Sequence, residues 1–148
     1  MPQSLANIVI HVIWSTKERR PLIADGVRPQ LHGYMAGILK NIESPALIIN
    51  SVSDHVHVLC QLSKNIAACK LVEEVKKSSS KWMKEQGVGD FSWQNGYGVF
   101  SVSQSNVDAV RKYIEGQPEH HRKRDFKDEF REFCIKYNVA IDECYVWD

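Results

Sequence analysis

A strand-like segment near the N-terminus constrains the fold of this chain more than any other part of its sequence. Between Ala6 and Ser15, apolar and β-branched residues occupy most of the alternating positions of an extended backbone. Such a segment is typical of a strand that is buried over most of its surface. We therefore expect residues 6–15 to lie inside a β-sheet.

The rest of the chain contains further helical and extended patterns. Helices are predicted where apolar residues recur every three or four positions, and strands where they are β-branched or alternate. Ser105 with Asp108 resembles a capping box at the start of a helix that Pro118 ends. In chain order, the predicted segments are a helix at 28–41, strands at 46–52 and 55–62, a helix at 66–86, two extended pieces within 91–102 around an Asn95-Gly96 turn, the helix from 105 to 118, and a last helix at 126–137.

This order of segments predicts an α+β fold. It fits the ferredoxin-like, split βαβ plan, in which a mostly antiparallel sheet carries helices on one face. With 148 residues, the chain has the length of one ordinary domain. We therefore expect a single domain at 1–148, with an acidic helical tail from about residue 125.

The net charge of +1 conceals an asymmetry along the chain. Residues 1–124 hold 16 Lys and Arg against 11 Asp and Glu, whereas residues 125–148 hold 3 against 7. A basic body is compatible with a polyanionic partner, because Lys and Arg neutralise phosphates. The excess is nevertheless small for a protein that binds by electrostatics alone.

Targeting and redox features favour the cytoplasm. No apolar stretch approaches the roughly 18 residues of a membrane span, and the first residues lack a signal-peptide pattern. The four cysteines include no Cys-x-x-Cys pair, which favours reduced thiols. We expect a cytoplasmic protein without a membrane partner. A zinc site formed by Cys134, Cys144, His120 and His121 is a weaker alternative, because these spacings match no familiar pattern.

A His-x-His element in the predicted strand 55–62 is the first candidate for chemistry. Residues two apart on a strand point to the same face, so His55 and His57 project side by side while Val56 projects to the opposite, buried face. Two imidazoles on one rigid strand supply two of the ligands that a catalytic metal needs. The alternative is a pair of half-exposed surface histidines.

Tyr113 and Gln117 form the second candidate. Four residues apart on the predicted helix 105–118, they lie on one face, so a phenol and an amide oxygen can address one point. Tyrosine can act as a nucleophile that forms a covalent intermediate. The alternative is that Tyr113 is an ordinary half-buried aromatic residue.

Several basic residues are candidates for binding the phosphates of DNA. The alternative for each is a solvated helix face, or a helix end whose cations lie beside carbonyl dipoles. The candidates are Lys76, Lys77, Lys81, Arg111, Arg122, Lys123 and Arg124.

Four segments together resemble a known family. They are Val12-Ile13-Trp14-Ser15-Thr16-Lys17 with Arg19-Arg20-Pro21 after it, Asp54-His55-Val56-His57-Val58-Leu59, the segment from Phe91 to Val102, and Tyr113 with Gln117 four residues later. In this order and at this total length, the segments resemble the single-tyrosine HUH transposases of the IS200-like family, whose elements move as single-stranded DNA.

The resemblance implies a role for each matching residue. His55 and His57 match the metal-binding histidines of the family, Gln117 matches the third ligand, and Tyr113 matches the nucleophile. The implied reaction cleaves and rejoins single-stranded DNA at hairpin-containing ends through a 5′-phosphotyrosine intermediate, with Mg²⁺ or Mn²⁺ as cofactor. Family members are homodimers, and in many of them the helix that carries the tyrosine completes the active site of the other subunit, so the resemblance leaves open which subunit Tyr113 serves. Asp54 is close enough in sequence to reach the metal site, although a turn residue of this type more often bonds its own backbone.

Two other functions are compatible with parts of the sequence. A non-catalytic module could stack single-stranded nucleic acid on Trp14, Trp93 and Tyr97. A metal-dependent hydrolase without a covalent intermediate would tolerate the loss of Tyr113. Only the transposase reaction requires His55, His57, Tyr113 and Gln117 to converge.

Overall fold

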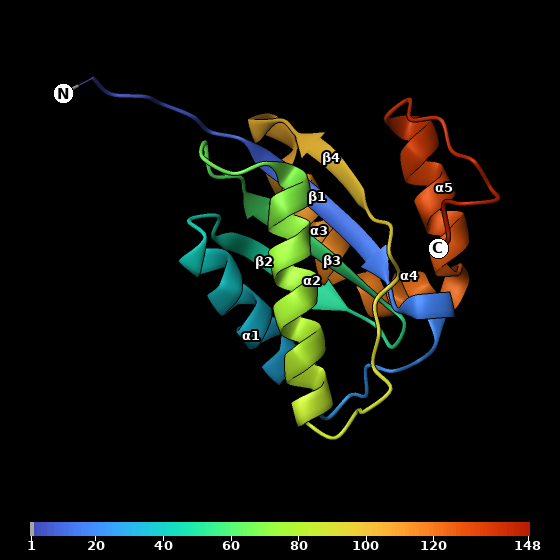
Figure 1. Cartoon of the computed structure of the whole chain (residues 1–148). Coiled ribbons are helices and arrows are strands. Elements are labelled where there is room, and N and C mark those ends of the chain that lie inside the picture. The colour runs from blue at the N-terminus through green and yellow to red at the C-terminus, as the bar shows by residue number, and fades with distance from the viewer. Residues whose placement is uncertain (1) are drawn as a thin grey trace.

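The computed structural model describes residues 2–148. Over these residues the chain forms four strands, five α-helices and two short 3-10 helices (Figure 1). In chain order they are β1 (Val9–Ser15), η1 (Lys17–Arg19), α1 (Arg28–Asn41), β2 (Ala46–Ser51), β3 (His55–Gln61), α2 (Ala68–Glu85), β4 (Gly98–Val102), η2 (Gln104–Asn106), α3 (Val107–Glu115), α4 (Gln117–Lys123) and α5 (Phe126–Lys136).

The four strands form one antiparallel sheet in the order β2-β3-β1-β4. This is the order of the split βαβ plan, so the predicted α+β, ferredoxin-like class is confirmed. The N-terminal strand β1 is central and buried along its whole length, as its composition predicts. Its register places Ser15 opposite His55 and Ile13 opposite His57.

Helices α1 and α2 cover one face of the sheet, in front of it in Figure 1. The core on this side takes Val12 and Trp14 from β1 and Val56, Val58 and Cys60 from β3, all at positions of one parity. The predicted burial of the Val56 side of β3 is therefore confirmed. The apolar stripes of α1 and α2 close this layer.

The opposite face of the sheet is also covered by helices, which corrects the expectation of helices on one face only. Helices α3 and α5 pack there against residues of the other parity, including Val9, Ile13 and Leu59. Because β1 and β3 are buried on both sides and carry apolar residues such as Val9, Ile13 and Leu59 on the second face, the sheet is covered on both faces. Close approach is required at Gly98, where an added Cβ would lie 2.8 Å from the ring of Phe130 on α5.

Two predicted segments differ from the structure. Within 91–102 only β4 is a strand, while Trp93 forms an isolated bridge with Thr16, so no hairpin surrounds Asn95-Gly96. The Ser105 and Asp108 pair is not a capping box, since α3 begins at Val107 without a side-chain cap. Among the described residues, no helix has both the length and the apolar character needed to cross a membrane.

Candidate active site

Strand β3 places His55 and His57 on the face of the sheet that α5 covers. Their exposed fractions are 1% and 0%, so the alternative of half-exposed surface histidines is wrong. The strand alternation makes them neighbours, and the helices of the second layer remove them from water. Two imidazoles without solvent need other polar groups as hydrogen-bond partners.

Asp54 is a partner of His55. Its Oδ1 lies 2.7 Å from Nδ1 of His55 and accepts a hydrogen bond that orients the ring. Burial would lower the pKa of His55, but the carboxylates of Asp54 and Glu129 outweigh burial and raise the pKa to about 9. Free of other ligands, His55 is therefore a buried cation at neutral pH.

His57 is held by His11 on the neighbouring strand β1. Nδ1 of His57 lies 2.8 Å from Nε2 of His11, and the two rings stack with centroids 5.0 Å apart. Burial lowers the pKa of His57, although Glu129 acts in the opposite direction, so His57 is neutral. Burial also lowers the pKa of His11, and its Nδ1 is buried without a hydrogen-bond partner.

Glu129, in the first turn of α5, is the centre of the site and was not predicted. Its Oε1 lies 2.8 Å from Nε2 of His57 and 3.3 Å from Nε2 of His55. Burial would raise its pKa, but the hydrogen bonds from both histidines hold the pKa far below its ordinary range. The sequence contains one signal for this role: Glu129 is three residues after Phe126 and four before Phe133, a carboxylate on the apolar stripe of a helix.

Tyr113 reaches the same carboxylate from α3. Its hydroxyl donates a hydrogen bond to Oε2 of Glu129 and accepts one from Arg124 at 3.0 Å. Its ring stacks on His120, with centroids 4.5 Å apart. Burial and the charge of Glu129 raise the pKa of Tyr113, so the phenol is neutral in this arrangement.

Gln117 also reaches the site, but not from the helix of Tyr113. The predicted helix 105–118 is broken at Gly116, so Gln117 is the first residue of α4. It is fully buried, with Oε1 3.2 Å from Nε2 of His55 and Nε2 3.4 Å from Oε2 of Glu129. Pro118 in the first turn of α4 has no amide hydrogen for a continuing helix, which is consistent with this break.

These side chains form a compact donor set for a divalent ion. Ligand atoms of His55, His57 and Glu129 all lie within 4.8 Å of one another. Ligands about 2.0–2.2 Å from one ion are separated by roughly 3.0–3.5 Å, which is close to the observed N–O distances. Gln117 adds a neutral oxygen beside His55, and Asp54 and His11 hold the outer nitrogens of the two imidazoles. The residues therefore fit a divalent metal.

Among the described residues, the ligands of the alternative zinc site, Cys134, Cys144, His120 and His121, are not brought together as a group. The groups of described residues that could hold a metal contain no cysteine, and Cys134 is buried while Cys144 is exposed. His121 instead lies near Asp54 and His55, as a second possible group of ligands.

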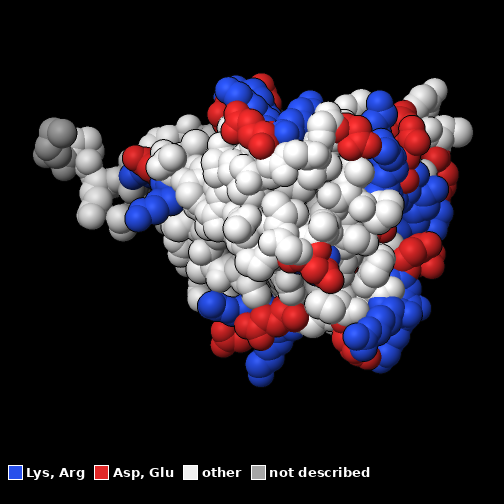
Figure 2. Space-filling view, turned by 90° about the horizontal axis from the view of Figure 1, so that it is seen from below, with Lys and Arg blue, Asp and Glu red and all other residues white. Residues whose placement is uncertain are grey.

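The seven basic candidates do not gather around this site. Arg124 alone contacts Tyr113, and it also forms an ion pair with Glu132. Arg111 and Arg122 pair with acidic residues of their own helices, as Lys77 does, whereas Lys81 and Lys123 are exposed. On the face shown in Figure 2, basic and acidic side chains lie side by side around a wide uncharged area.

Lys76 has a structural environment that its sequence position does not indicate. Its amino group donates hydrogen bonds to the backbone oxygens of residues 94, 95 and 96, at 2.8, 3.2 and 2.6 Å. It also lies over the rings of Trp14 and Tyr97. Burial lowers the pKa of Lys76 to about 8. This amino group therefore ties the 94–96 loop to α2.

The aromatic residues of the binding-module alternative are mostly unavailable. Trp14 and Trp93 pack edge to face in the core, with exposed fractions of 1% and 6%. Tyr97 is exposed. One exposed ring does not form the stacking platform that the alternative requires.

With this fold and site, comparison with known proteins places the chain among the transposases, enzymes that cleave and transfer DNA. Residues 4–117 match the family model described as "Transposase IS200 like". The chain therefore belongs to the IS200-like transposase family, as its sequence resemblance predicts. The match includes the two strand histidines, Tyr113 and Gln117, but ends before α5 and Glu129.

One sequence relative agrees with this assignment, and two solved structures share the fold. The ISDra2 transposase TnpA of Deinococcus radiodurans is 26% identical over 114 residues, which cover 72% of this chain and 81% of that protein. The crystal structure of a protein described as a transposase from Deinococcus radiodurans R1 superposes on this chain with a TM-score of 0.61 at 24% identity. The superposition covers 79% of this chain and 98% of that one. A REP-associated tyrosine transposase bound to a REP hairpin superposes with a TM-score of 0.62 at 13% identity, covering 82% and 72%.

Proposed function

We propose that this protein cleaves and rejoins single-stranded DNA through a covalent intermediate on Tyr113. The observation that supports the proposal is that four candidate residues converge on one carboxylate within a single chain. Tyr113, His55, His57 and Gln117 come from three different elements, and all four lie within hydrogen-bond or ion-pair distance of the Glu129 carboxylate. Family membership supports the same reaction, because these residues match the positions that the family uses.

Tyr113 supplies the nucleophile. Its oxygen forms a bond to the phosphorus of a DNA phosphodiester, and the bond from phosphorus to the 3′ oxygen of the preceding nucleotide breaks. The products are a 5′-phosphotyrosine and a 3′ end, whose oxygen takes up a proton to become a hydroxyl. Attack of a 3′-hydroxyl on the phosphotyrosine reverses these bond changes and rejoins a strand.

The residues around Tyr113 control its proton. Glu129 accepts the hydrogen bond of the phenol and orients its oxygen, while the low pKa of Glu129 makes it a weak base, so the proton that the phenol loses is balanced by the one that the departing 3′ oxygen takes up. Arg124 donates to the same phenol oxygen and brings a positive charge to the point where phosphate would dock. In the free protein the pKa of Tyr113 stays raised by burial and by Glu129, so the phenol is not ionised before substrate binds.

His55, His57 and Glu129 would hold the divalent ion, with Gln117 as a further ligand. When bound, Mg²⁺ or Mn²⁺ would polarise a phosphate oxygen and offset the charge that develops during in-line attack. The hydrogen bond that Asp54 accepts would orient His55, and His11 would orient His57. We give Asp54 this orienting role and not that of a direct ligand.

The substrate we propose is a DNA strand that carries a hairpin next to the cleavage site. The relative bound to a REP hairpin supports this choice. Because the Tyr113 hydroxyl is bonded to Glu129, the carboxylate that also contacts His55 and His57 of the same chain, we propose that each subunit uses its own tyrosine. The family resemblance also leads us to propose that the protein is a homodimer and that it is cytoplasmic. Light scattering of the purified protein would test the dimer.

A denaturing gel tests the proposed reaction. The protein is mixed with labelled single-stranded DNA from the flanks of its own gene, in Mn²⁺ or in chelator. We expect a covalent adduct that needs the metal and is absent from Tyr113→Phe, while Tyr34→Phe, at an exposed tyrosine of α1 on the other face of the sheet, still forms it. Cleavage without an adduct would favour the metal-dependent hydrolase, and binding without cleavage would favour the non-catalytic module.

A further inference from the structure

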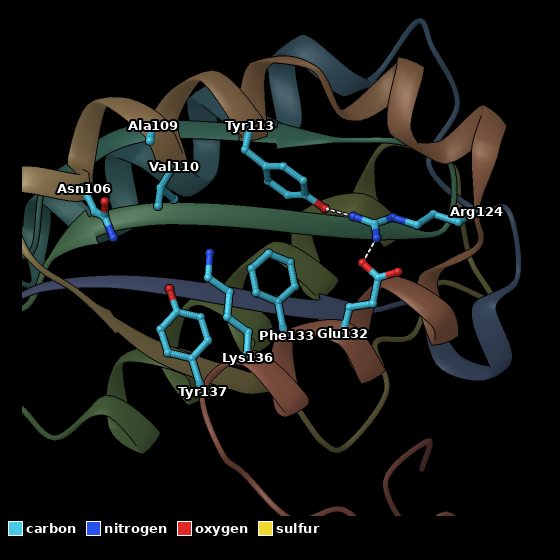
Figure 3. A pocket seen from close by; sticks show the side chains of 9 residues that line it. All are labelled: Asn106, Ala109, Val110, Tyr113, Arg124, Glu132, Phe133, Lys136 and Tyr137. Carbon is cyan, nitrogen blue, oxygen red and sulfur yellow. Dashed lines mark hydrogen bonds and ion pairs between the residues drawn. The ribbon is translucent and has the colours of Figure 1, made fainter.

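A pocket of about 490 Å³ lies between α3 and α5, directly beside Tyr113 (Figure 3). This volume falls within the range of about 300–1,000 Å³ that is typical of small-molecule sites. None of the residues that form the metal-binding set lines it. The lining residues are Asn106, Ala109, Val110, Tyr113, Arg124, Glu132, Phe133, Lys136 and Tyr137.

The walls of the pocket are apolar and partly aromatic. Ala109 and Val110 of α3 face Phe133 of α5 and Tyr137, the residue that follows α5, across the space (Figure 3). The rings of Phe133 and Tyr137 are nearly parallel, with an interplanar angle of 15°. A flat aromatic guest would bury its faces against these walls, as a base does when it stacks on aromatic side chains.

The two ends of the pocket are polar, and Arg124, which is paired with Glu132, lies at one of them. At one end Arg124 donates a hydrogen bond to the hydroxyl of Tyr113, which is the position of a reacting phosphate under the proposed function. At the other end lie the amide of Asn106 and the hydroxyl of Tyr137, both neutral (Figure 3). The amino group of Lys136 points into the pocket, toward α3 (Figure 3).

We propose that this pocket binds the unpaired base of the DNA nucleotide attached to the scissile phosphate. The inference rests on the proposed function, since that function places the phosphate at Tyr113 and Arg124. A base lies within one nucleotide of its own phosphate, and the pocket begins at the phenol. The anionic end of the nucleotide meets Arg124, the planar base meets the aromatic walls, and its polar edge meets Asn106.

The shape of the pocket and its hydrogen-bonding groups favour this occupant. A base that is paired in a duplex presents its edges to the other strand and cannot enter a pocket between two helices. Asn106 can both donate and accept, so it can pair with the hydrogen-bonding edge of a base. We therefore expect the pocket to distinguish between the four bases at one side of the cleavage site.

Nucleotide binding tests the pocket without requiring cleavage. Each of the four deoxynucleoside 5′-monophosphates is titrated into the metal-free protein, and amide NMR shifts are recorded, with deoxyribose 5-phosphate as the ligand that lacks a base. We expect saturable shifts at residues 106–113 and 133–137 for at least one nucleotide and none there for the sugar phosphate. Equal responses to the sugar phosphate, or shifts centred elsewhere, would overturn the proposal.

Variants of exposed pocket residues sharpen this measurement. Ala109→Phe fills the space from the exposed side of α3 and should abolish the shifts. Lys136→Gln should weaken nucleotide binding about 2- to 5-fold, whereas Lys112→Gln, an exposed cation outside the pocket, should leave it unchanged. Tyr113→Phe should still bind the nucleotide, because its ring remains.

Measurements of adduct formation distinguish a failure of the proposed base site from a failure of the proposed reaction. Removing the base at either nucleotide next to the cleavage site should slow adduct formation by wild type about 10-fold or more at one of the two positions. Ala109→Phe should be slow with intact DNA and insensitive to base removal. If wild type forms the adduct equally well without either base, the base site is refuted while the proposed reaction stands. If nucleotides bind the pocket but no adduct forms, the reaction is refuted and with it the assignment to the scissile nucleotide, while binding of a nucleotide base by the pocket stands.

Discussion

Glu129 provides the sharpest test of how this site is held together. In the metal-free protein its carboxylate is 2% exposed and is the acceptor for His57 at 2.8 Å, beside the His55 nitrogen at 3.3 Å. Glu129→Ala would leave the His55 cation with Asp54 alone and would leave Tyr113 without its acceptor. Breaking a buried charged pair costs about 3–5 kcal/mol, and we expect the lower end because Asp54 remains.

Two further substitutions measure the contribution of charge. Glu129→Gln keeps the shape and one acceptor oxygen, so we expect a loss of about 1–2 kcal/mol. Glu132→Ala is the matched control on the same helix, since Glu132 is an exposed carboxylate paired with Arg124. A surface pair of this kind contributes about 0–1 kcal/mol.

Urea unfolding in chelator at neutral pH measures these free energies, with circular dichroism and tryptophan fluorescence as independent probes. A thermal melt with added Mn²⁺ then reports metal binding, because a ligand that binds only the folded state raises its melting temperature. We expect wild type to respond strongly and Glu129→Ala weakly. Equal losses for Glu129→Ala and Glu132→Ala in chelator would refute the buried-charge reasoning, and an undiminished response to Mn²⁺ would refute the role of Glu129 as a ligand.

Three other predictions concern the fold around the site. Gly98→Ala should lower the free energy of unfolding by about 1–3 kcal/mol in urea titrations, because its Cβ would lie 2.8 Å from the ring of Phe130; a neutral result would mean that α5 can shift freely. His32, bonded to Ser51 at 2.7 Å, has its pKa lowered by burial to about 4, so the unfolded state binds more protons and stability should fall as pH drops from about 6.5 toward 4. His32→Gln should flatten that slope, and an unchanged slope would assign it to other groups. Lys76→Ala should cost about 1–2 kcal/mol by releasing the 94–96 carbonyls, whereas the exposed Lys77→Ala should cost less than about 0.5 kcal/mol by the same assay.

Local patterns predicted the elements that carry most of the site. The helix predicted at 28–41 has the same bounds in the structure, and the strand predicted at 55–62 is β3. These segments could be predicted because their periodicity depends only on neighbours along the chain. The alternation of β3 also indicated that His55 and His57 share a face. The nature of that face did not follow, because burial depends on what packs there.

Contacts between distant segments decided the rest of the site. Glu129 lies more than seventy residues from the histidines, so its approach to them depends on the packing of α5 against the sheet. Gln117 was expected on the helix of Tyr113, yet it reaches the site from the start of α4. The break at Gly116 changes the direction of the chain, and tertiary packing then selects which side chains point inward.

The sequence by itself determined most of the order of strands and helices, the pairing of two histidines on one strand, and a tyrosine and glutamine that match one family. Only the tertiary structure decided that both faces of the sheet are covered, that the histidines are buried, and that a carboxylate from the acidic tail lies between them. The physical reason is that periodicity records the preference of each segment for one buried side. It does not record which segment will supply the cover, since that choice is made by packing and by the pairing of buried polar groups across the whole chain.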